Sequence, residues 1–320
     1  MKLPVNLVEH ELKVFEEKFK DAAKSNVSML DRIMRYIVRR KGKQLRPMFV
    51  FLSAKLFGPA NDSTYRAASL VELLHTATLV HDDVVDDSME RRGFFSVYAL
   101  WKNKASVLVG DYLLAKGLLL SLENNDYRIL QFLSEAVRLM SEGELLQMEK
   151  SRSLNLDETV YFEIIKNKTA SLLASACAAG AWSTSQTEEV AMKMKSFGEK
   201  VGIAFQIKDD LFDYSSQDIG KPTGNDIKEK KLTLPMIYAL NNVDKETRRK
   251  MIYIIKNQNT TKSKVDYIID AVVKNGGIDY ANSKMKAYKK EALDILHSFP
   301  DSDIKMGFED LVNFVTDRKY

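Results

Sequence analysis

The chain has 320 residues, of which 45% are hydrophobic and 29% are charged. This composition is typical of a globular protein and excludes a disordered chain, a collagen-like fibre and a coiled-coil rod. Lysine and arginine number 48 against 44 aspartate and glutamate residues, so the formal charge of +4 gives no argument for a nucleic-acid partner. The single cysteine, Cys177, cannot form an internal disulfide, which is typical of a protein from a reducing cytoplasm.

The sequence predicts neither a signal peptide nor a transmembrane segment. The N-terminal segment alternates charged and apolar side chains and lacks the apolar core of a secretory signal. The longest uncharged stretch, Thr169 to Thr187, is rich in Ser, Thr and Ala, so it predicts a tightly packed buried helix instead of a membrane span. We therefore expect a cytoplasmic location.

Helical patterns run through almost the whole chain. No proline lies between Pro59 and Pro222, and that interval is free of the residue that most strongly breaks helices. Apolar residues recur at three- and four-residue spacing, and no alternating run with a tight-turn signature predicts a strand. Asp62 or Ser63 is expected to cap the third helix. The predicted helices span residues 5–38, 47–57, 62–89, 104–123, 127–150, 157–184, 187–214, 233–242, 244–257, 261–274, 277–297 and 302–318.

The longest polar loop covers residues 215–231, and no linker divides the chain. We therefore expect a single all-α domain over residues 1–320.

The first acidic cluster follows an apolar helix at His81-Asp82-Asp83-Val84-Val85-Asp86-Asp87. Asp82 and Asp86 are four residues apart, so on a helix they project from one face, with Asp83 beside them. Like charges at this spacing repel each other, which favours a bound cation, and carboxylate oxygens suit Mg²⁺. A solvated helix end is the alternative interpretation of one such cluster.

A second cluster repeats the DDxxD spacing with Asp209, Asp210 and Asp213, again after an apolar helix. Two copies on separate helices are harder to explain as solvated surface. If they face each other, they can hold Mg²⁺ ions with a polyanion between them. The D-x-D-x-D-G spacing of a calcium loop is absent.

Basic residues follow both acidic clusters. Arginine binds phosphate oxygens through two parallel hydrogen bonds, and lysine supplies a point charge. A surface position is the alternative for any one lysine, and a plain salt bridge to the aspartates is the alternative for the Arg91-Arg92 pair. No Ser-His-Asp order, P-loop or zinc-ligand spacing competes with this interpretation. The basic residues after the first cluster are Arg91, Arg92 and Lys168, those after the second are Lys221, Lys230 and Lys231, and an earlier loop adds Lys43 and Arg46.

Together these motifs resemble the trans-prenyltransferase family, the all-trans polyprenyl diphosphate synthases. The resemblance implies an all-α bundle of about ten or more helices around a central cavity, and a homodimer. Two departures are Lys41-Gly42-Lys43, where the family usually has Gly-Gly-Lys, and Lys230, where it often has glycine. The resemblance covers nearly the whole chain and rests on GKQLRP, LLHTATLVHDDVVDDSMERRG, SVLVGDYLL, SEGELLQ, KNKTASLLASA, FQIKDDLFDY and GKPTGNDIKEKKLTLP.

The resemblance implies that the protein condenses isopentenyl diphosphate with an allylic diphosphate. Metal ions and cations stabilise the departing diphosphate, and the allylic carbocation forms in a pocket shielded from water. The isopentenyl double bond then attacks the cation, and the released diphosphate takes the proton. Release of the product at a membrane surface is a further expectation.

The resemblance also assigns roles to single residues. Asp82, Asp86 and Asp209 would bind about three Mg²⁺ ions, supported by Asp83, Asp210 and Asp213. The allylic diphosphate would be held by Arg91, Lys168, Thr169, Gln206, Lys221 and Lys231. Isopentenyl diphosphate would be held by Lys43, Arg46, His75 and Arg92, with a core histidine as the alternative for His75. The loop over residues 215–231 is expected to act as a lid that a bound diphosphate orders.

Product length is expected to depend on the residues one turn before Asp82. Ala77 and Thr78 are small, whereas short-chain members of the family tend to have aromatic rings there. The tunnel would then reach Phe132 or Met140, which predicts a hexaprenyl to nonaprenyl product, C30–C45.

Three alternatives stay open. The chain could be a short-chain farnesyl or geranylgeranyl diphosphate synthase, a terpene cyclase, or a non-catalytic synthase subunit. Cyclases usually replace the second aspartate cluster, and non-catalytic subunits tend to lose one of the two clusters.

Overall fold

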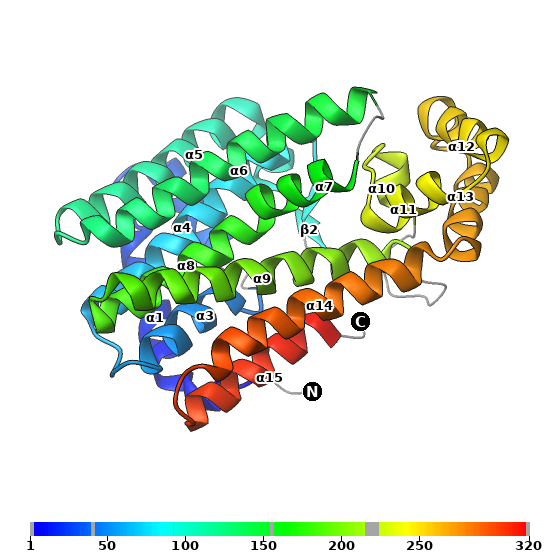
Figure 1. Ribbon diagram of the computed structural model, residues 1–320. Coiled ribbons are helices and arrows are strands. Elements are labelled where there is room, and N and C mark those ends of the chain that lie inside the picture. Colours follow the sequence, from blue (N-terminus) through cyan, green and yellow to red (C-terminus); the bar gives the residue numbers. More distant parts are fainter. Residues whose placement is uncertain (1–2, 40–41, 92, 154–156, 215–223, 318–320) are drawn as a thin grey trace.

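The computed structural model describes residues 3–317 except 40–41, 92, 154–156 and 215–223. The described residues form an all-α bundle with one short hairpin, which confirms the predicted fold class (Figure 1). The elements are η1 (Val5–Leu7), α1 (Glu9–Ala22), α2 (Ser28–Val38), α3 (Leu45–Lys55), α4 (Asp62–Val85), β1 (Glu90–Arg91), β2 (Phe94–Phe95), α5 (Val97–Leu122), α6 (Tyr127–Ser153), α7 (Glu158–Ile165), η2 (Lys166–Ala170), α8 (Ser171–Ser185), α9 (Glu188–Phe212), α10 (Asn225–Lys228), α11 (Leu234–Asn242), α12 (Lys245–Asn257), α13 (Lys262–Lys274), α14 (Gly277–His297) and α15 (Asp303–Asp317).

Helix α8 lies at the centre of the bundle, between α3, α4, α6 and α9. Its small side chains let neighbouring helices approach closely: a Cβ atom at Gly180 would lie 2.2 Å from the carbonyl oxygen of Val50 on α3. Nearly all of α8 is buried. The prediction of a tightly packed buried helix over this uncharged stretch is therefore confirmed.

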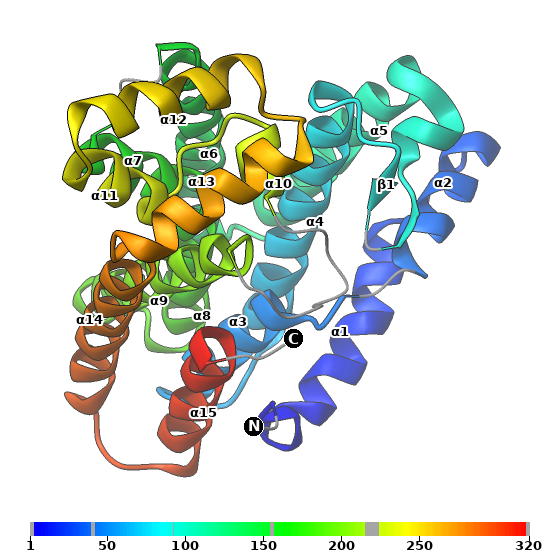
Figure 2. The same ribbon diagram turned by 90° about the vertical axis from the view of Figure 1, so that its right-hand side faces the viewer.

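The long helices and the short helices α10 to α13 occupy distinct parts of the molecule. The long helices α5, α6, α8, α9 and α14 run side by side, and α10 to α13 gather at one end of them (Figure 1). Figure 2 shows the C-terminal end of α4 between the β1–β2 hairpin on one side and α10 on the other. Residues far apart in the sequence therefore meet at this end of α4.

Several predicted boundaries are wrong for identifiable local reasons. The helix predicted over 5–38 is two helices, and the break contains Ser25, whose hydroxyl accepts a hydrogen bond from the Val27 amide and so competes with helical bonding. The cap of α4 is Asn61, not Asp62 or Ser63, because the Asn61 side chain accepts from the Thr64 amide in a reciprocal capping box. The helix predicted over 157–184 contains η2, a π-helical turn.

The hairpin was not predicted, because its two-residue strands are too short to show alternation. Glu90 pairs with Phe95 and Arg91 with Phe94, around Gly93 at φ 76°. A short helical segment from Val97, capped by the Ser96 hydroxyl that accepts from the Ala99 amide, precedes the predicted start at residue 104. The backbone breaks at Lys102, at φ 66°, and the long part of α5 follows that break, close to the predicted start.

Among the described helices, α5 has the length and composition of a membrane-spanning helix, with a mean hydropathy of 1.5. The sequence did not predict such a helix. In this structure α5 packs along α4, with further contacts to α2 and α6, so it forms a layer of the bundle.

Candidate active site

The first acidic cluster lies where α4 ends. The predicted helix over 62–89 ends at Val85, because Asp87 adopts a left-handed conformation at φ 48° and the Ser88 amide bonds back to the Asp83 carbonyl. The Asp86 amide still donates to the Asp82 carbonyl at 2.8 Å, so one helical turn still links these two residues. Asp86 is exposed, Asp82 is partly buried, and Asp83 is buried.

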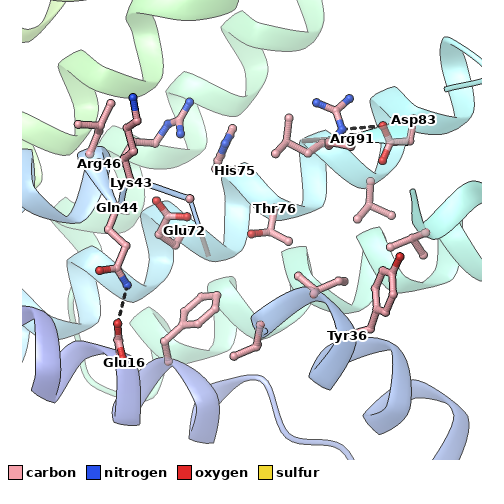
Figure 3. A pocket seen from close by; sticks show the side chains of 18 of the residues that line it. Glu16, Tyr36, Lys43, Gln44, Arg46, Glu72, His75, Thr76, Asp83 and Arg91 are labelled. Carbon is pink, nitrogen blue, oxygen red and sulfur yellow. Dashed lines mark hydrogen bonds and ion pairs between the residues drawn. The ribbon is translucent and has the colours of Figure 1, made fainter. Parts of the chain in front are cut away.

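Arg91 of the hairpin forms an ion pair with this cluster. Its Nε atom donates to the Asp83 carboxylate at 2.6 Å (Figure 3). The salt bridge considered as an alternative for the arginine pair is thus present for Arg91. Burial raises the pKa of Asp83, and the Arg91 guanidinium opposes this rise.

Asp82 lies in a site where its negative charge is poorly compensated. Burial raises its pKa, and the neighbouring Glu144 carboxylate raises it further, whereas Lys168 and Arg91 oppose the rise. A divalent cation would remove this penalty by favouring the ionised form. The donor set therefore fits a hard cation.

Lys168 lies in the π-helical turn η2 and contacts α6. It forms an ion pair with Glu144 and donates to the Gln147 side-chain oxygen at 3.2 Å. Single π-helical turns within helices are frequent at functional sites. Glu144 and Gln147 had no assigned role in the sequence interpretation, although both lie in the SEGELLQ motif.

A hydrogen-bonded chain continues from η2 to the second acidic cluster. The Thr169 hydroxyl donates to the Gln206 side-chain oxygen at 2.8 Å, and the Gln206 amide donates to Asp210 at 2.8 Å. Tyr161 on α7 donates to the other Asp210 oxygen at 2.7 Å. Burial raises the pKa of Asp210 to about 7 despite the hydrogen bonds from Gln206 and Tyr161.

The members of the second cluster have different environments. Asp213 accepts the backbone amides of Asn225 at 2.8 Å and Asp226 at 3.1 Å, so it fixes the start of α10. Asp210 is buried, whereas Asp209 is partly exposed. Asp209 is thus the more accessible of this adjacent pair.

Asp226 is a candidate that the sequence interpretation did not identify. Burial, with the neighbouring Asp210 and Asp213 carboxylates, raises its pKa to about 8. In the sequence, Asp226 lies in the GKPTGNDIKEKK motif, thirteen residues after Asp213. Only the fold brings the two residues together.

Lys231 electrostatically links the two acidic clusters. Burial opposes its charged form, but the ion pair with Glu229 and the nearby Asp226 and Asp86 carboxylates raise its pKa. Asp86 belongs to the first cluster, and Asp226 is a neighbour of Asp210 and Asp213 in the second, so one cation lies near both clusters. The preceding residue, Lys230, has φ 58°, a left-handed conformation that favours the family's usual glycine.

A cavity of about 530 Å³ extends from the first acidic cluster to the start of α3. In Figure 3, Lys43, Arg46 and His75 gather toward one end of it, and the Arg91–Asp83 pair lies at the other. His75 is 7% exposed, so it is buried like a core histidine and also lines the cavity. The predicted isopentenyl diphosphate residues are therefore brought together, as far as the structure describes them.

Some residues of the sequence interpretation cannot be placed. Arg92, Lys221 and residues 215–223 of the proposed lid lie outside the described residues. Within the described ranges, no group of three His, Cys, Asp or Glu side chains is close enough to hold a metal ion alone. Mg²⁺ commonly takes one or two carboxylates and completes its shell with water and substrate phosphates, so this arrangement is compatible with it.

The residues proposed to set the product length lie in different environments. Ala77 is fully buried and packs among side chains of α2 and α5, whereas Thr78 is partly exposed and donates to the His75 carbonyl at 2.9 Å. Phe132 on α6 is buried against Ala178, and Met140 packs against the main core.

Residues 27–272 match the sequence model of the polyprenyl synthetase family. The chain is 32% identical over 298 residues to octaprenyl diphosphate synthase from Haemophilus influenzae, covering 92% of this chain and 90% of the relative. The chain therefore belongs to the polyprenyl synthetase family, and it is an enzyme that transfers prenyl groups to lengthen an isoprenoid chain.

Two solved structures share the fold. A polyprenyl synthase from Caulobacter crescentus, in complex with calcium and isoprenyl diphosphate, is 34% identical with a TM-score of 0.91, covering 99% of this chain and 97% of that one. A geranylgeranyl pyrophosphate synthase from Bacteroides thetaiotaomicron is 39% identical with a TM-score of 0.84, covering 98% of each chain.

Proposed function

We propose that the protein is a Mg²⁺-dependent synthase that condenses isopentenyl diphosphate with an allylic diphosphate to give an all-trans polyprenyl diphosphate. The observation that carries this proposal is a cavity with Lys43, Arg46 and His75 toward one end and, at the other, Asp83 of the first acidic cluster paired with Arg91. Two diphosphates need two cationic or metal-binding ends, and this cavity offers both. The calcium and isoprenyl diphosphate bound by the Caulobacter relative support the same assignment.

We assign the metal to Asp82, Asp86 and Asp209, with about three ions when substrate is bound. Bound Mg²⁺ supplies positive charge to the departing diphosphate. These carboxylates suit it because they are partly exposed or exposed, whereas the neighbouring Asp83 and Asp210 are buried.

The chain's own cations would bind and orient the substrates. Arg91, Lys168 and Lys231 surround the two acidic clusters and would stabilise the allylic diphosphate as it leaves. Thr169 would hold the Gln206 side chain, and Gln206 would orient Asp210, through their hydrogen bonds. Lys43, Arg46 and His75 would hold isopentenyl diphosphate with its double bond near the allylic carbon. The released diphosphate would accept the final proton, since no protein base is assigned.

We propose a product of C30–C45, supported by the small side chains at Ala77 and Thr78. Because Ala77 packs against α2 and α5, the growing tail would pass on the Thr78 side of α4. A short-chain product is the second candidate, favoured by the 39% identity to the Bacteroides geranylgeranyl pyrophosphate synthase.

We also propose that the chain is one domain that forms a cytoplasmic homodimer through α5 and α6. Exposed apolar side chains repeat along both helices and form a surface that a second copy would cover. They are Val107, Leu108, Leu118, Leu119 and Leu122 on α5, and Tyr127, Leu145 and Met148 on α6.

Substrate omission with purified protein tests the proposed reaction. Labelled isopentenyl diphosphate should enter a longer diphosphate only when Mg²⁺ and an allylic diphosphate are both present. A cyclase would consume the allylic diphosphate without isopentenyl diphosphate, and a non-catalytic subunit would consume neither.

A further inference from the structure

A second cavity, of about 880 Å³, lies between α2, β2 and the first turn of α5, and we call it the α2–α5 groove. Figure 2 shows these elements along one edge of the molecule. None of the residues assigned to the metal or the diphosphates lines the groove. Its wall combines basic and large apolar side chains, which are Arg32, Arg35, Arg39, Phe94, Leu100 and Trp101.

The groove carries a positive charge. Arg32, Arg35 and Arg39 are exposed and follow one face of α2, whereas Asp31 is the one acidic residue among the groove's described lining. Asp31 forms an ion pair with Arg35. Arg32 and Arg39 form no ion pair with any side chain in the part of the chain that the structure describes. The complementary ligand is therefore an anion.

Apolar side chains border these arginines. Phe94 is 51% exposed and Leu100 is 44% exposed, and Met29 at the start of α2 is 52% exposed. Arginine beside exposed aromatic and aliphatic side chains is typical of surfaces that lie at a membrane interface, where charge meets headgroups and apolar groups enter the acyl boundary. A free inorganic anion would leave this apolar rim unused.

Tyr36 connects the groove to the proposed active site. It lines both cavities, stacks edge-to-face on Trp101 at 5.1 Å, and donates to the Phe95 carbonyl at 2.6 Å. The β1–β2 hairpin that it holds also carries Arg91. A surface bound at the groove would therefore be separated from the reaction cavity by one side chain, that of Tyr36.

We propose that the α2–α5 groove docks the protein on bilayers that contain anionic phospholipids. Arg32 and Arg39 bind headgroup phosphates, and Phe94, Leu100 and Trp101 enter the boundary between headgroups and acyl chains. Vesicle binding is measured without substrate, so a failure to dock can be distinguished from a failure of the proposed reaction.

Sedimentation with vesicles tests the charge requirement. The full chain should bind vesicles of phosphatidylcholine with phosphatidylglycerol, bind pure phosphatidylcholine far more weakly, and lose binding as salt rises. Each arginine near an anionic surface contributes roughly fivefold, so Arg32→Gln with Arg39→Gln should weaken binding roughly 25-fold. Arg248→Gln with Arg249→Gln, on the exposed face of α12, is the matched control and should bind like the wild type.

Two results would overturn the proposal. One is equal vesicle binding by the wild type and the Arg32/Arg39 double variant. The other is loss of vesicle binding on adding inorganic phosphate at the headgroup concentration and constant ionic strength, which would make the groove a free-phosphate site. Unchanged vesicle binding in the presence of inorganic phosphate supports docking on the lipid surface.

Tryptophan fluorescence locates the contact. The chain has two tryptophans, Trp101 and Trp182, so Trp182→Phe leaves Trp101 as the sole reporter. Anionic vesicles should shift its emission to shorter wavelength, and Leu100→Ser should reduce the shift. Vesicle binding without any change in Trp101 emission would contradict docking at this groove.

Discussion

Tyr161 of α7 donates its phenolic hydrogen to Asp210 of α9 at 2.7 Å, and both side chains are buried. This bond ties the second acidic cluster to a neighbouring helix. It also explains how two adjacent aspartates differ: Asp210 is held by the protein, whereas Asp209 is more accessible to a metal ion.

Tyr161→Phe should destabilise the ligand-free protein, because it removes a hydrogen bond to a buried carboxylate. The expected loss in the free energy of unfolding is about 1–3 kcal/mol. Urea denaturation measures it, with Tyr253→Phe, an exposed tyrosine on α12, as the matched control. Equal stability of the Tyr161 variant and the wild type would contradict the importance of this bond.

Stability should depend on pH through the buried acids. The folded protein keeps the Asp210 proton to about pH 7 and the Asp226 proton to about pH 8, whereas the ordinary pKa of an aspartate side chain is 3.8. The unfolded chain thus binds fewer protons in this window, so the free energy of unfolding falls as the pH rises from about 4 to about 8.

Asp226→Asn should flatten this pH dependence and stabilise the ligand-free protein near pH 8. Asp294→Asn, an exposed position within α14, should leave the profile unchanged. Denaturation curves across the pH window measure both variants. A profile that keeps its wild-type slope in Asp226→Asn would show that this carboxyl does not cause the slope.

Asp82→Ala or Asp209→Ala should reduce turnover by at least roughly 100-fold, because each removes a group proposed to hold the metal that stabilises the leaving diphosphate. Circular dichroism should show an intact helical fold, since removing mutually repelling acids does not weaken the ligand-free protein. Near-wild-type Mg²⁺-dependent condensation by either variant is incompatible with the metal assignment.

The sequence predicted the helices well where the apolar periodicity was long. It missed features that depend on two or three residues: the break at Ser25, the hairpin around Gly93 and the early cap at Ser96. Such features depend on one hydrogen bond or one backbone angle, which leaves no periodic signal.

The site was predictable where a motif repeats in the sequence, as the DDxxD spacing of aspartates does in the two acidic clusters. Spacing alone does not single out Asp226 or Glu144, because their importance comes from neighbours on other helices. Nor did the spacing separate Asp209 from Asp210, since burial and the Tyr161 hydroxyl make that difference.

Ala77 and Thr78 should respond differently to an aromatic ring. Thr78→Phe places the ring on the partly exposed side of α4 and should shorten the product to about C15–C20. Ala77→Phe should mainly destabilise the fold, by about 1–3 kcal/mol, because Ala77 is fully buried against α2 and α5. Chromatography of dephosphorylated products measures length. If both variants are active with unchanged products, the tail does not pass this face, and a wild-type product that already stops at C15–C20 would refute the small-residue argument.

The most direct test of the account is a time course of the products formed from an allylic diphosphate, excess isopentenyl diphosphate and Mg²⁺, followed by mass spectrometry. The account predicts a ladder of prenyl diphosphates that differ by one isoprene unit and accumulate at C30–C45, all abolished by chelating the metal. Consumption of the allylic diphosphate without incorporation of isopentenyl diphosphate, or a ladder unaffected by chelation, would contradict it.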